Sequence, residues 1–216
     1  MATVLDQPTQ AQQKVILHGV TWETYERLLA EHQDSSSTRF AYDRGTLEIM
    51  ILSLRHERLK HTLATLVEIV AEEMQIDIEG TGSTTFRRED LERGFEPDAC
   101  FYIINAERIR QKDEIDLTTD PPPEIIIEID ISSPSLSKFP IFAALGVAEV
   151  WRYDGARIGI FCLAAGGYVT ATESTTLPGV TDTILNRLLE ASRTMKRTDW
   201  TRLVRESVSK AAGEGE

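Results

Sequence analysis

The segment EIIIEIDISSPS, residues 124–135, alternates isoleucine with acidic side chains. Successive side chains of a β-strand point to opposite faces of the sheet. One face of this strand therefore carries isoleucine alone, and the other face becomes acidic toward the C-terminal end. The acidic face holds Glu124, Ile126, Glu128, Asp130 and Ser132. The segment predicts a strand that presents Glu128 and Asp130 on the same side.

Two interpretations of the acidic face remain open from this segment. An antiparallel sheet with one face in water produces the same alternation without any function. Alternatively, the carboxylates belong to a functional site at the end of the strand.

The composition is that of a globular protein. The chain has 216 residues, of which 41% are hydrophobic and 27% charged, and this length is sufficient for a sizeable apolar core. We expect a single domain over residues 1–216, with a flexible leader over 1–14 and a helical tail over 182–216.

The formal net charge of −12 argues against a protein whose whole surface attracts nucleic acid. A polyanion would have to meet a local basic patch. One candidate lies between Ile184 and Lys210, where basic residues outnumber Glu190, Asp199 and Glu206. Its basic residues are Arg187, Arg193, Lys196, Arg197, Arg202, Arg205 and Lys210. A solvated helical tail explains the same residues without any partner.

The sequence also bears on location. We expect no transmembrane helix and no secretory signal, because no segment has the required apolar length or basic region. The two cysteines, Cys100 and Cys162, both lie in strand-like segments. We expect two buried free thiols in a reducing cytoplasm, with a disulfide between them as the alternative. Neither cysteine has the close partner spacing of a zinc site.

Three segments in the first third of the sequence have clear periodicity. Residues 22–32 place apolar side chains at helical spacing behind Thr21, which can cap the first turn. Residues 39–52 alternate and break at Asp43-Arg44-Gly45, which predicts a hairpin. Residues 56–74 repeat apolar side chains every three or four positions, which predicts an amphipathic helix.

The rest of the chain predicts more strands than helices. Strand-like segments bounded by glycines or turns occupy residues 76–80, 83–90 and 94–103, and three more strands lie within 148–171. A polar loop is expected over 105–123 and a short helix over 136–147, where Pro140 and Gly146 suit a start and a stop. This order predicts a mixed α/β (α+β) fold, a mixed β-sheet flanked by helices, with an N-terminal helix and hairpin.

Carboxylates stand at two of the predicted strand ends. Asp98 follows Pro97 at the start of one apolar strand, while Glu128 and Asp130 stand near the end of another. Carboxylates from adjacent strand ends can converge on a hard divalent cation such as Mg²⁺, which prefers oxygen ligands. The spacing is compatible with a metal site.

An ordered set of short motifs surrounds these acids. They are LEIM at 47–50, HE at 56–57, PD at 97–98, the acidic strand followed by SPS at 133–135, Lys138, GV at 146–147 and EVW at 149–151. In this order they resemble the Uma-two family of restriction-endonuclease-like proteins, which belongs to the PD-(D/E)XK nuclease superfamily. The resemblance covers residues 21–153.

The resemblance implies a restriction-endonuclease-like core and an endonuclease that acts on DNA with Mg²⁺, or with Mn²⁺ in its place. By similarity, Asp98 is the first metal-binding acid. The second acid is Asp130 if the chain is aligned on SPS, and Glu128 if it is aligned on the strand. Both candidates stay open.

The lysine departs from the superfamily pattern. An E-x-K motif has a lysine two residues after the acid, but Asp130 stands at that distance from Glu128, and Ser132 from Asp130. Lys138 matches the family's lysine at the head of the following helix. From there it could orient the attacking water or offset negative charge on the phosphate. A surface lysine at a helix start is the alternative.

Three further polar residues lie in the first long helix and in the hairpin. The superfamily often has an acid from the first long helix near the metal, so the resemblance implies auxiliary roles for His56 and Glu57. An exposed pair on a helix is the alternative. Glu48 alternates with Leu47 and Ile49, and we expect it on the exposed polar face of the hairpin.

The resemblance also implies partners. We expect a homodimer with the segment Ile158–Val169 in the contact, because such nucleases commonly cut two strands with two copies. DNA is the expected substrate, and no membrane is expected. The acidic charge and the displaced lysine favour an alternative, a non-catalytic nuclease-fold module that binds nucleic acid or protein. Glycoside hydrolysis by Glu128 and Asp130 is a third class, but no run of aromatics predicts a sugar-binding surface.

Overall fold

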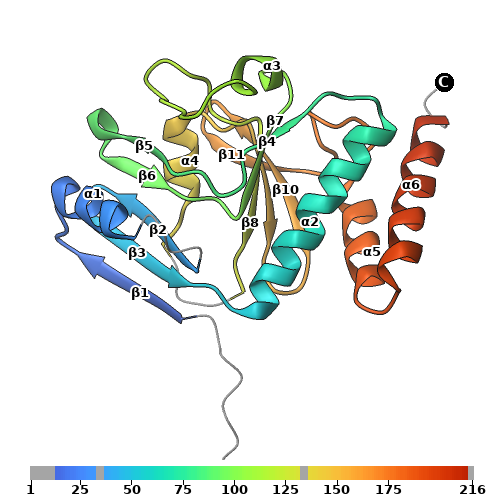
Figure 1. The fold of residues 1–216 in the computed structure, drawn as a ribbon, viewed down its shortest axis with the longest axis horizontal. Helices are drawn as coiled ribbons and strands as arrows, with labels where there is room; N and C mark the ends of the chain where they lie inside the picture. The colour runs from blue at the N-terminus through green and yellow to red at the C-terminus, as the bar shows by residue number, and fades with distance from the viewer. Residues whose placement is uncertain (1–12, 33–36, 132–135, 214–216) are drawn as a thin grey trace, which may run out of the picture.

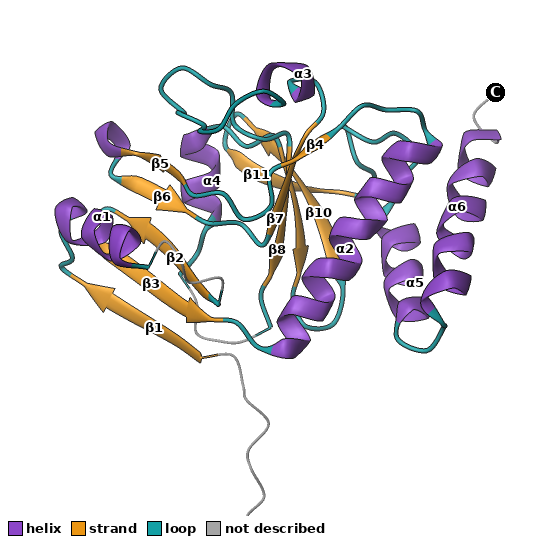
Figure 2. Cartoon of the chain, in the orientation of Figure 1, coloured by secondary structure: helices purple, strands orange, loops and turns teal. Residues whose placement is uncertain are grey.

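Two β-sheets, lying side by side, organise the chain in the computed structural model (Figure 1), which describes residues 13–32, 37–131 and 136–213. One sheet has six strands and is mixed, and the other has five strands and is antiparallel. Helices cover both faces of the six-stranded sheet (Figure 2). The predicted mixed α/β class is therefore confirmed.

The six-stranded sheet contains the acidic strand at its centre. Its order is β11-β10-β9-β8-β7-β4. The bounds are β4 Glu79–Gly80, β7 Ala99–Tyr102, β8 Ile125–Ile129, β9 Glu149–Tyr153, β10 Ile158–Ala164 and β11 Gly167–Ala171. β8 pairs antiparallel with β7 and parallel with β9.

All five residues of β8 are buried, so neither face of this strand is in water. The interpretation of the acidic face as a solvent-exposed sheet surface was wrong. Glu124, just before the strand, accepts a hydrogen bond of 2.7 Å from the backbone N–H of Ile103. Its carboxylate thus helps to fix the end of the neighbouring strand.

The five-stranded sheet has the order β1-β3-β2-β6-β5. Its bounds are β1 Gln13–His18, β2 Thr38–Asp43, β3 Thr46–Ile51, β5 Phe86–Arg88 and β6 Arg93–Phe95. The predicted hairpin is β2–β3, and Arg44 and Gly45 turn it with φ values of +44° and +90°, as a two-residue hairpin loop requires. β1 was not predicted, and it begins within the segment expected as a leader.

The predicted strand over residues 94–103 is two strands in different sheets. β6 ends at Phe95, β7 begins at Ala99, and Glu96-Pro97-Asp98 lies between them. Pro97 lacks a backbone N–H for a sheet ladder, which favours a break at this position. The chain therefore crosses from one sheet to the other immediately before Asp98.

Five of the six described α-helices lie where the sequence predicted helix. Their bounds are α1 Trp22–Glu31, α2 Leu54–Glu73, α3 Ala106–Ile109, α4 Phe139–Leu145, α5 Asp182–Ser192 and α6 Arg197–Gly213. A 3₁₀ turn covers Glu89–Leu91. α4 has Pro140 in its first turn and ends at Gly146, whose φ of +80° suits glycine. α3 lies within the segment expected as a loop. No helix within the described ranges is long and apolar enough to span a membrane.

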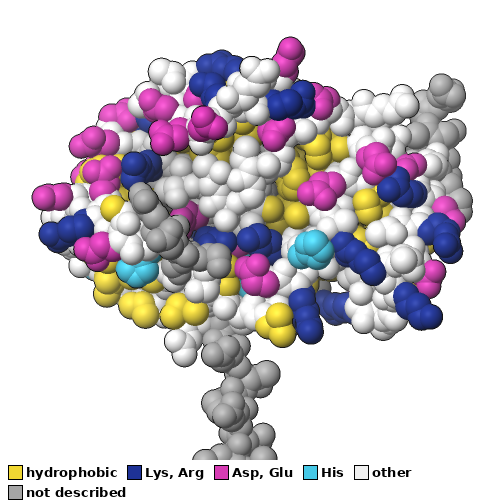
Figure 3. Space-filling view, in the orientation of Figure 1, with side chains coloured by type: hydrophobic (Ala, Val, Ile, Leu, Met, Phe, Trp, Pro, Cys, Tyr) yellow, Lys and Arg dark blue, Asp and Glu magenta, His cyan; other side chains and the backbone are white. Residues whose placement is uncertain are grey.

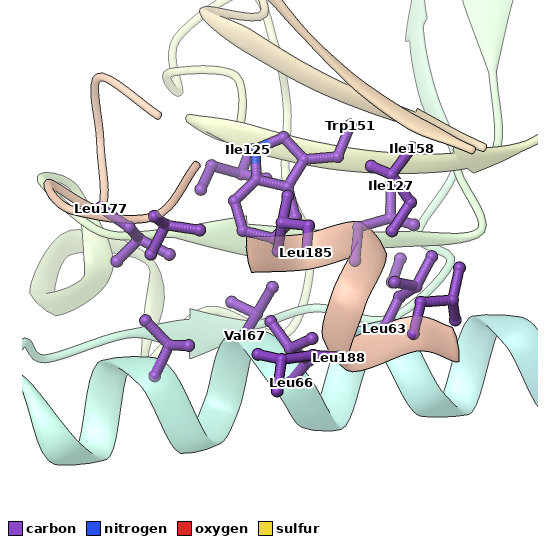
Figure 4. Close-up of a cluster of buried hydrophobic side chains, with 14 of the residues drawn as sticks. Leu63, Leu66, Val67, Ile125, Ile127, Trp151, Ile158, Leu177, Leu185 and Leu188 are labelled. Carbon is purple, nitrogen blue, oxygen red and sulfur yellow. The ribbon is translucent and has the colours of Figure 1, made fainter. Parts of the chain in front are cut away.

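The main core lies between one face of the six-stranded sheet and helices α2, α5 and α6 (Figure 4). Leu63, Leu66 and Val67 of α2 pack in the same cluster as Ile125 and Ile127 of β8. The indole N–H of Trp200 in α6 donates to the backbone carbonyl of Leu188 in α5 at 2.7 Å. The helical tail is therefore part of the fold.

The basic residues of this tail have acidic neighbours. Arg205 forms ion pairs with Glu72 and Glu73 of α2, and other pairs join Arg193 to Glu190 and Arg202 to Asp199. Much of the local positive charge is thereby balanced. This arrangement favours the interpretation as a solvated helical tail.

The opposite face of the six-stranded sheet meets α4 and the five-stranded sheet. Cys100 and Ile126 pack there against Phe142 of α4 and Phe95 of β6. Asp98 and Glu128 follow the same alternation as Cys100 and Ile126, so both side chains belong to this face. The fold thus places two of the predicted acids between the sheets.

Candidate active site

Asp98 is held from two directions. The Nε2 of His56 donates to Oδ1 of Asp98 at 2.6 Å, and the backbone N–H of Ile129 donates to Oδ2 at 2.7 Å. His56 and Asp98 are both fully buried. Ser53 caps α2 by accepting from the N–H of His56, which orients the first turn of the helix toward the sheet. Both oxygens of Asp98 are therefore fixed in direction.

The surroundings of Asp98 favour its ionised form. Burial raises the pKa of this carboxyl, but the interactions with His56, the charge of Lys138 and the N–H of Ile129 outweigh burial. The net effect lowers the pKa of Asp98 below its ordinary value. Asp98 therefore stands between the sheets as a carboxylate.

Glu128 and Lys138 form the second contact of the site. Glu128 lies in β8, and Lys138 is the residue immediately before α4. The Nζ of Lys138 donates to Oε1 of Glu128, and both side chains are buried. The predicted alternative of a surface lysine at a helix start was therefore wrong. α4 follows β8 in the sequence, and Lys138 just before α4 lies against β8.

Glu48 completes the cluster from the five-stranded sheet. Its Oε1 lies 3.5 Å from Nζ of Lys138, and its Oε2 accepts from the backbone N–H of Leu136 at 2.8 Å. Only 1% of Glu48 is exposed, so its expected position on an exposed polar face was wrong. The hairpin turns this face toward the segment before α4. The motif LEIM was the one sequence signal that could have indicated Glu48.

The charges of the cluster act on one another. Burial raises the pKa of Glu128, and Asp98 and Glu48 add to the rise while Lys138 opposes it. Burial lowers the pKa of Lys138, but Glu128, Glu48 and Asp98 outweigh it and raise this pKa overall. Lys138 is therefore an ammonium ion. Three buried carboxyl groups surround one buried ammonium, which leaves an excess of acidic groups.

Asp130, the other candidate for the second acid, has different partners. It accepts from Nζ of Lys14 at 2.9 Å and from Arg152 at 2.7 Å. Burial raises the pKa of Asp130, but these two cations lower it overall. Among the described contacts, Glu128 and not Asp130 touches Lys138. The SPS motif at 133–135 lies outside the described residues.

A cavity of about 200 Å³ joins these two groups of charges. Glu128 and Lys138 line one part of it, and Asp130 lines another. The remaining lining residues are Lys14, Leu136, Ser137, Phe139, Phe142 and Arg152. A ligand in this cavity would contact both carboxylates that the sequence singled out.

Residues 22–195 match the family model Uma2, described as "Putative restriction endonuclease". This chain belongs to the Uma2 family. The resemblance to the Uma-two family is thereby confirmed, and the match extends beyond Tyr153 to Met195. The comparison with curated proteins finds no match.

The fold is shared with a solved structure. The chain is similar to a crystal structure from Anabaena variabilis ATCC 29413 described as a "putative nuclease belonging to DUF820". The sequence identity is 14%, the TM-score is 0.54, and the similarity covers 79% of this chain and 99% of that chain. At this identity the similarity shows the fold alone.

In this Uma2 chain the side chains of the sequence neighbours His56 and Glu57 have different surroundings. His56 contacts Asp98, whereas Glu57 lines a separate wide groove of about 980 Å³. The Glu57 side chain is 44% exposed, and its Oε2 lies 3.8 Å from Nζ of Lys60. Among the described contacts, none joins Glu57 to Asp98. The structure therefore brings only His56 of the two auxiliary candidates to the acids.

The acids of this Uma2 chain are suitable donors for a hard cation. Within the part of the chain that the structure describes, no three His, Cys, Asp or Glu side chains stand ready as a metal-binding set. Even so, Asp98, Glu128 and Glu48 supply carboxylate oxygens, which Mg²⁺ prefers. Burial and the neighbouring carboxylates raise the pKa of Glu128, and a cation bound here would stabilise its ionised form. The donor chemistry fits a divalent cation.

Proposed function

We propose that this chain is a Mg²⁺-dependent endonuclease that hydrolyses phosphodiester bonds in DNA. The observation that carries the proposal is the buried contact of Lys138 with Glu128, close to the ionised Asp98. Carboxylates that hold a cation, beside an ammonium that can face a phosphate, are the elements that phosphodiester hydrolysis requires. Membership of the Uma2 family supports the same reaction class.

Each side chain has a role in this proposal. Asp98 and Glu128 would hold the cation, with Glu48 as a further carboxylate. A bound Mg²⁺ would polarise the phosphate and make water a better nucleophile. Lys138 would stabilise the negative charge that develops on the phosphate oxygens. His56 orients Asp98 through the bond to Oδ1 and thus acts as a positioning residue.

A local basic patch supports DNA as the substrate despite the negative net charge. Arg55, Arg58 and Lys60 lie in the first two turns of α2, and both arginines are exposed. Lys and Arg side chains gather near this end of α2 in Figure 3. The N-terminal end of a helix also favours anions. Because α2 begins with the turn that carries His56, this patch lies next to the candidate site and is suited to the DNA backbone.

We further propose that the enzyme acts as a homodimer in a reducing cytoplasm. Both cysteines are free, as predicted; Cys100 is buried and Cys162 half-buried. Burial raises the pKa of Cys100 to about 12, which keeps it an unreactive thiol. The segment that we expect in the dimer contact, Ile158–Val169, includes the beginning of β11, which lies at one edge of the six-stranded sheet.

Incubation with supercoiled plasmid tests the nuclease function. We expect nicking or linearisation with Mg²⁺ or Mn²⁺, none with EDTA, and none with Asp98→Ala. Asp77→Ala removes the same charge from an exposed ion pair with Arg110 and should cleave like the wild type.

A thermal-melting series tests the cation separately. Millimolar Mg²⁺ should raise the melting temperature of the wild type by mass action and should not raise that of Asp98→Ala. A wild type that cuts neither DNA nor RNA and melts independently of Mg²⁺ and Mn²⁺ would favour the non-catalytic module.

A further inference from the structure

Asp130 ties together two cations from distant parts of the chain. Lys14 comes from β1 of the five-stranded sheet, and Arg152 comes from β9 of the six-stranded sheet. The bonds measure 2.9 Å and 2.7 Å. Among the described contacts, one carboxylate thus serves two positive charges.

Arg152 is open to a ligand, although Asp130 holds it. Its side chain is 37% exposed, and its guanidinium lies 5.8 Å from the centre of the Phe139 ring. One terminal nitrogen donates to Asp130. Among the described residues, no acceptor takes the other guanidinium N–H groups. An arginine fork with donors to spare is well suited to a phosphate group.

The two cations border the cavity that also reaches Glu128 and Lys138. A nucleic acid strand whose phosphate lies at Lys138 would therefore carry its neighbouring phosphate along the same cavity. Contacts to phosphates position a nucleic acid without reading its sequence. Lys14 and Arg152, which both line this cavity, would then lie along the path of the backbone.

We propose that Lys14 and Arg152 form a phosphate-binding subsite for the nucleotide next to the cleaved bond, with Asp130 as the residue that positions both cations. This inference rests on the proposed nuclease function. It gives Asp130 a role other than that of the second metal-binding acid. Lys14 lies outside the residues that match the Uma2 family model, so the subsite includes a residue that the family match does not carry.

An ion pair that only fastens β1 to the six-stranded sheet is the competing explanation. It predicts a loss of stability, and no change in DNA affinity, when either cation is removed. A binding measurement separates the two explanations. The probe is a short fluorescent single-stranded DNA oligonucleotide in EDTA, so that anisotropy reports binding without cleavage.

Arg152→Gln and Lys14→Gln should each weaken this binding by about tenfold and lower the slope of log affinity against log salt by about one. Asp130→Asn should bind more tightly than the wild type, because the carboxylate charge then no longer competes with the phosphate for Lys14 and Arg152. Arg110→Gln is the matched control, since Arg110 is an exposed arginine paired with Asp77 and Glu79. It should bind like the wild type.

The outcomes distinguish this inference from the proposed function. If the wild type binds the oligonucleotide and Arg152→Gln and Lys14→Gln match Arg110→Gln in affinity and salt slope, the subsite is refuted and the nuclease proposal stands. A wild type that neither binds the oligonucleotide nor cuts plasmid refutes both. Should Arg152→Gln fail to fold, Arg152→Lys keeps the charge without the fork, and an affinity equal to that of the wild type would refute a guanidinium–phosphate contact.

Discussion

Lys138 contacts Glu128 across ten residues of sequence, from the position before α4 back to β8. An E-x-K pattern that starts at Glu128 requires a lysine at position 130, but this position is Asp130. No lysine stands at that position, and Lys138, immediately before α4, contacts the acid in its place. The same contact brings Lys138 to within 3.5 Å of Glu48.

Lys138→Ala should lower both the rate of cleavage and the free energy of unfolding. Loss of one well-placed electrostatic group should lower cleavage by about a hundred- to a thousandfold. Removal of the ammonium also leaves buried carboxyl groups without their cation, which costs about 3–5 kcal/mol for a broken buried pair. Mg²⁺ should restore part of this loss, so its effect on the melting temperature should exceed that in the wild type. Undiminished cleavage would assign the catalytic charge to another residue.

Asp98→Asn should change the pH dependence of stability. The pKa of Asp98 in the folded protein is lowered, despite burial, by His56, Lys138 and the N–H of Ile129. Such a group contributes stability above the unfolded pKa of about 3.9, and the contribution is lost as the pH falls through the folded pKa. The free energy of unfolding of the wild type, measured in urea, should therefore fall below about pH 4. That of the variant should fall less over the same range. Parallel curves for the two proteins would count against an ionised, stabilised Asp98.

His56→Ala should remove the hydrogen bond by which α2 holds the Asp98 carboxylate. The variant leaves a buried carboxylate oxygen without its donor, which costs about 1–3 kcal/mol, and cleavage should fall because Asp98 is no longer held. His61→Ala is the control, because His61 lies exposed on the same helix. Plasmid assays at a temperature where both variants are folded would check this. Equal activity of the two variants would remove His56 from the site.

Val169→Lys should dissociate the proposed homodimer. Val169 is 54% exposed in β11, and a charge on an edge strand opposes pairing with another copy. Light scattering should give a dimeric mass for the wild type and a monomeric mass for the variant. Leu17→Lys places the same charge on β1, at an edge of the other sheet, and should remain dimeric. A monomeric wild type at micromolar concentration would contradict the prediction.

Local patterns account for most of what the sequence could predict. The helices and the hairpin follow from periodicity and turn residues, and the place of Asp98 at a strand start follows from Pro97. Glu48 could not be placed, because its burial depends on a contact with Leu136, 88 residues away. The choice between Glu128 and Asp130 was equally beyond local pattern. Glu128 lies in β8 and Asp130 immediately follows that strand. Their partners, Lys138 for Glu128 and Lys14 and Arg152 for Asp130, come from other parts of the chain.

The separation of these contacts along the chain determines when the site can form. His56 and Asp98 are 42 residues apart, Glu48 and Leu136 are 88 apart, and Lys14 and Asp130 are 116 apart. Contacts between such distant residues form slowly, because long loops must close first. During synthesis from the N-terminus, the five-stranded sheet is complete long before Lys138 has been made. Until residue 138 has been added, a nascent chain therefore lacks the ammonium that the proposed site requires.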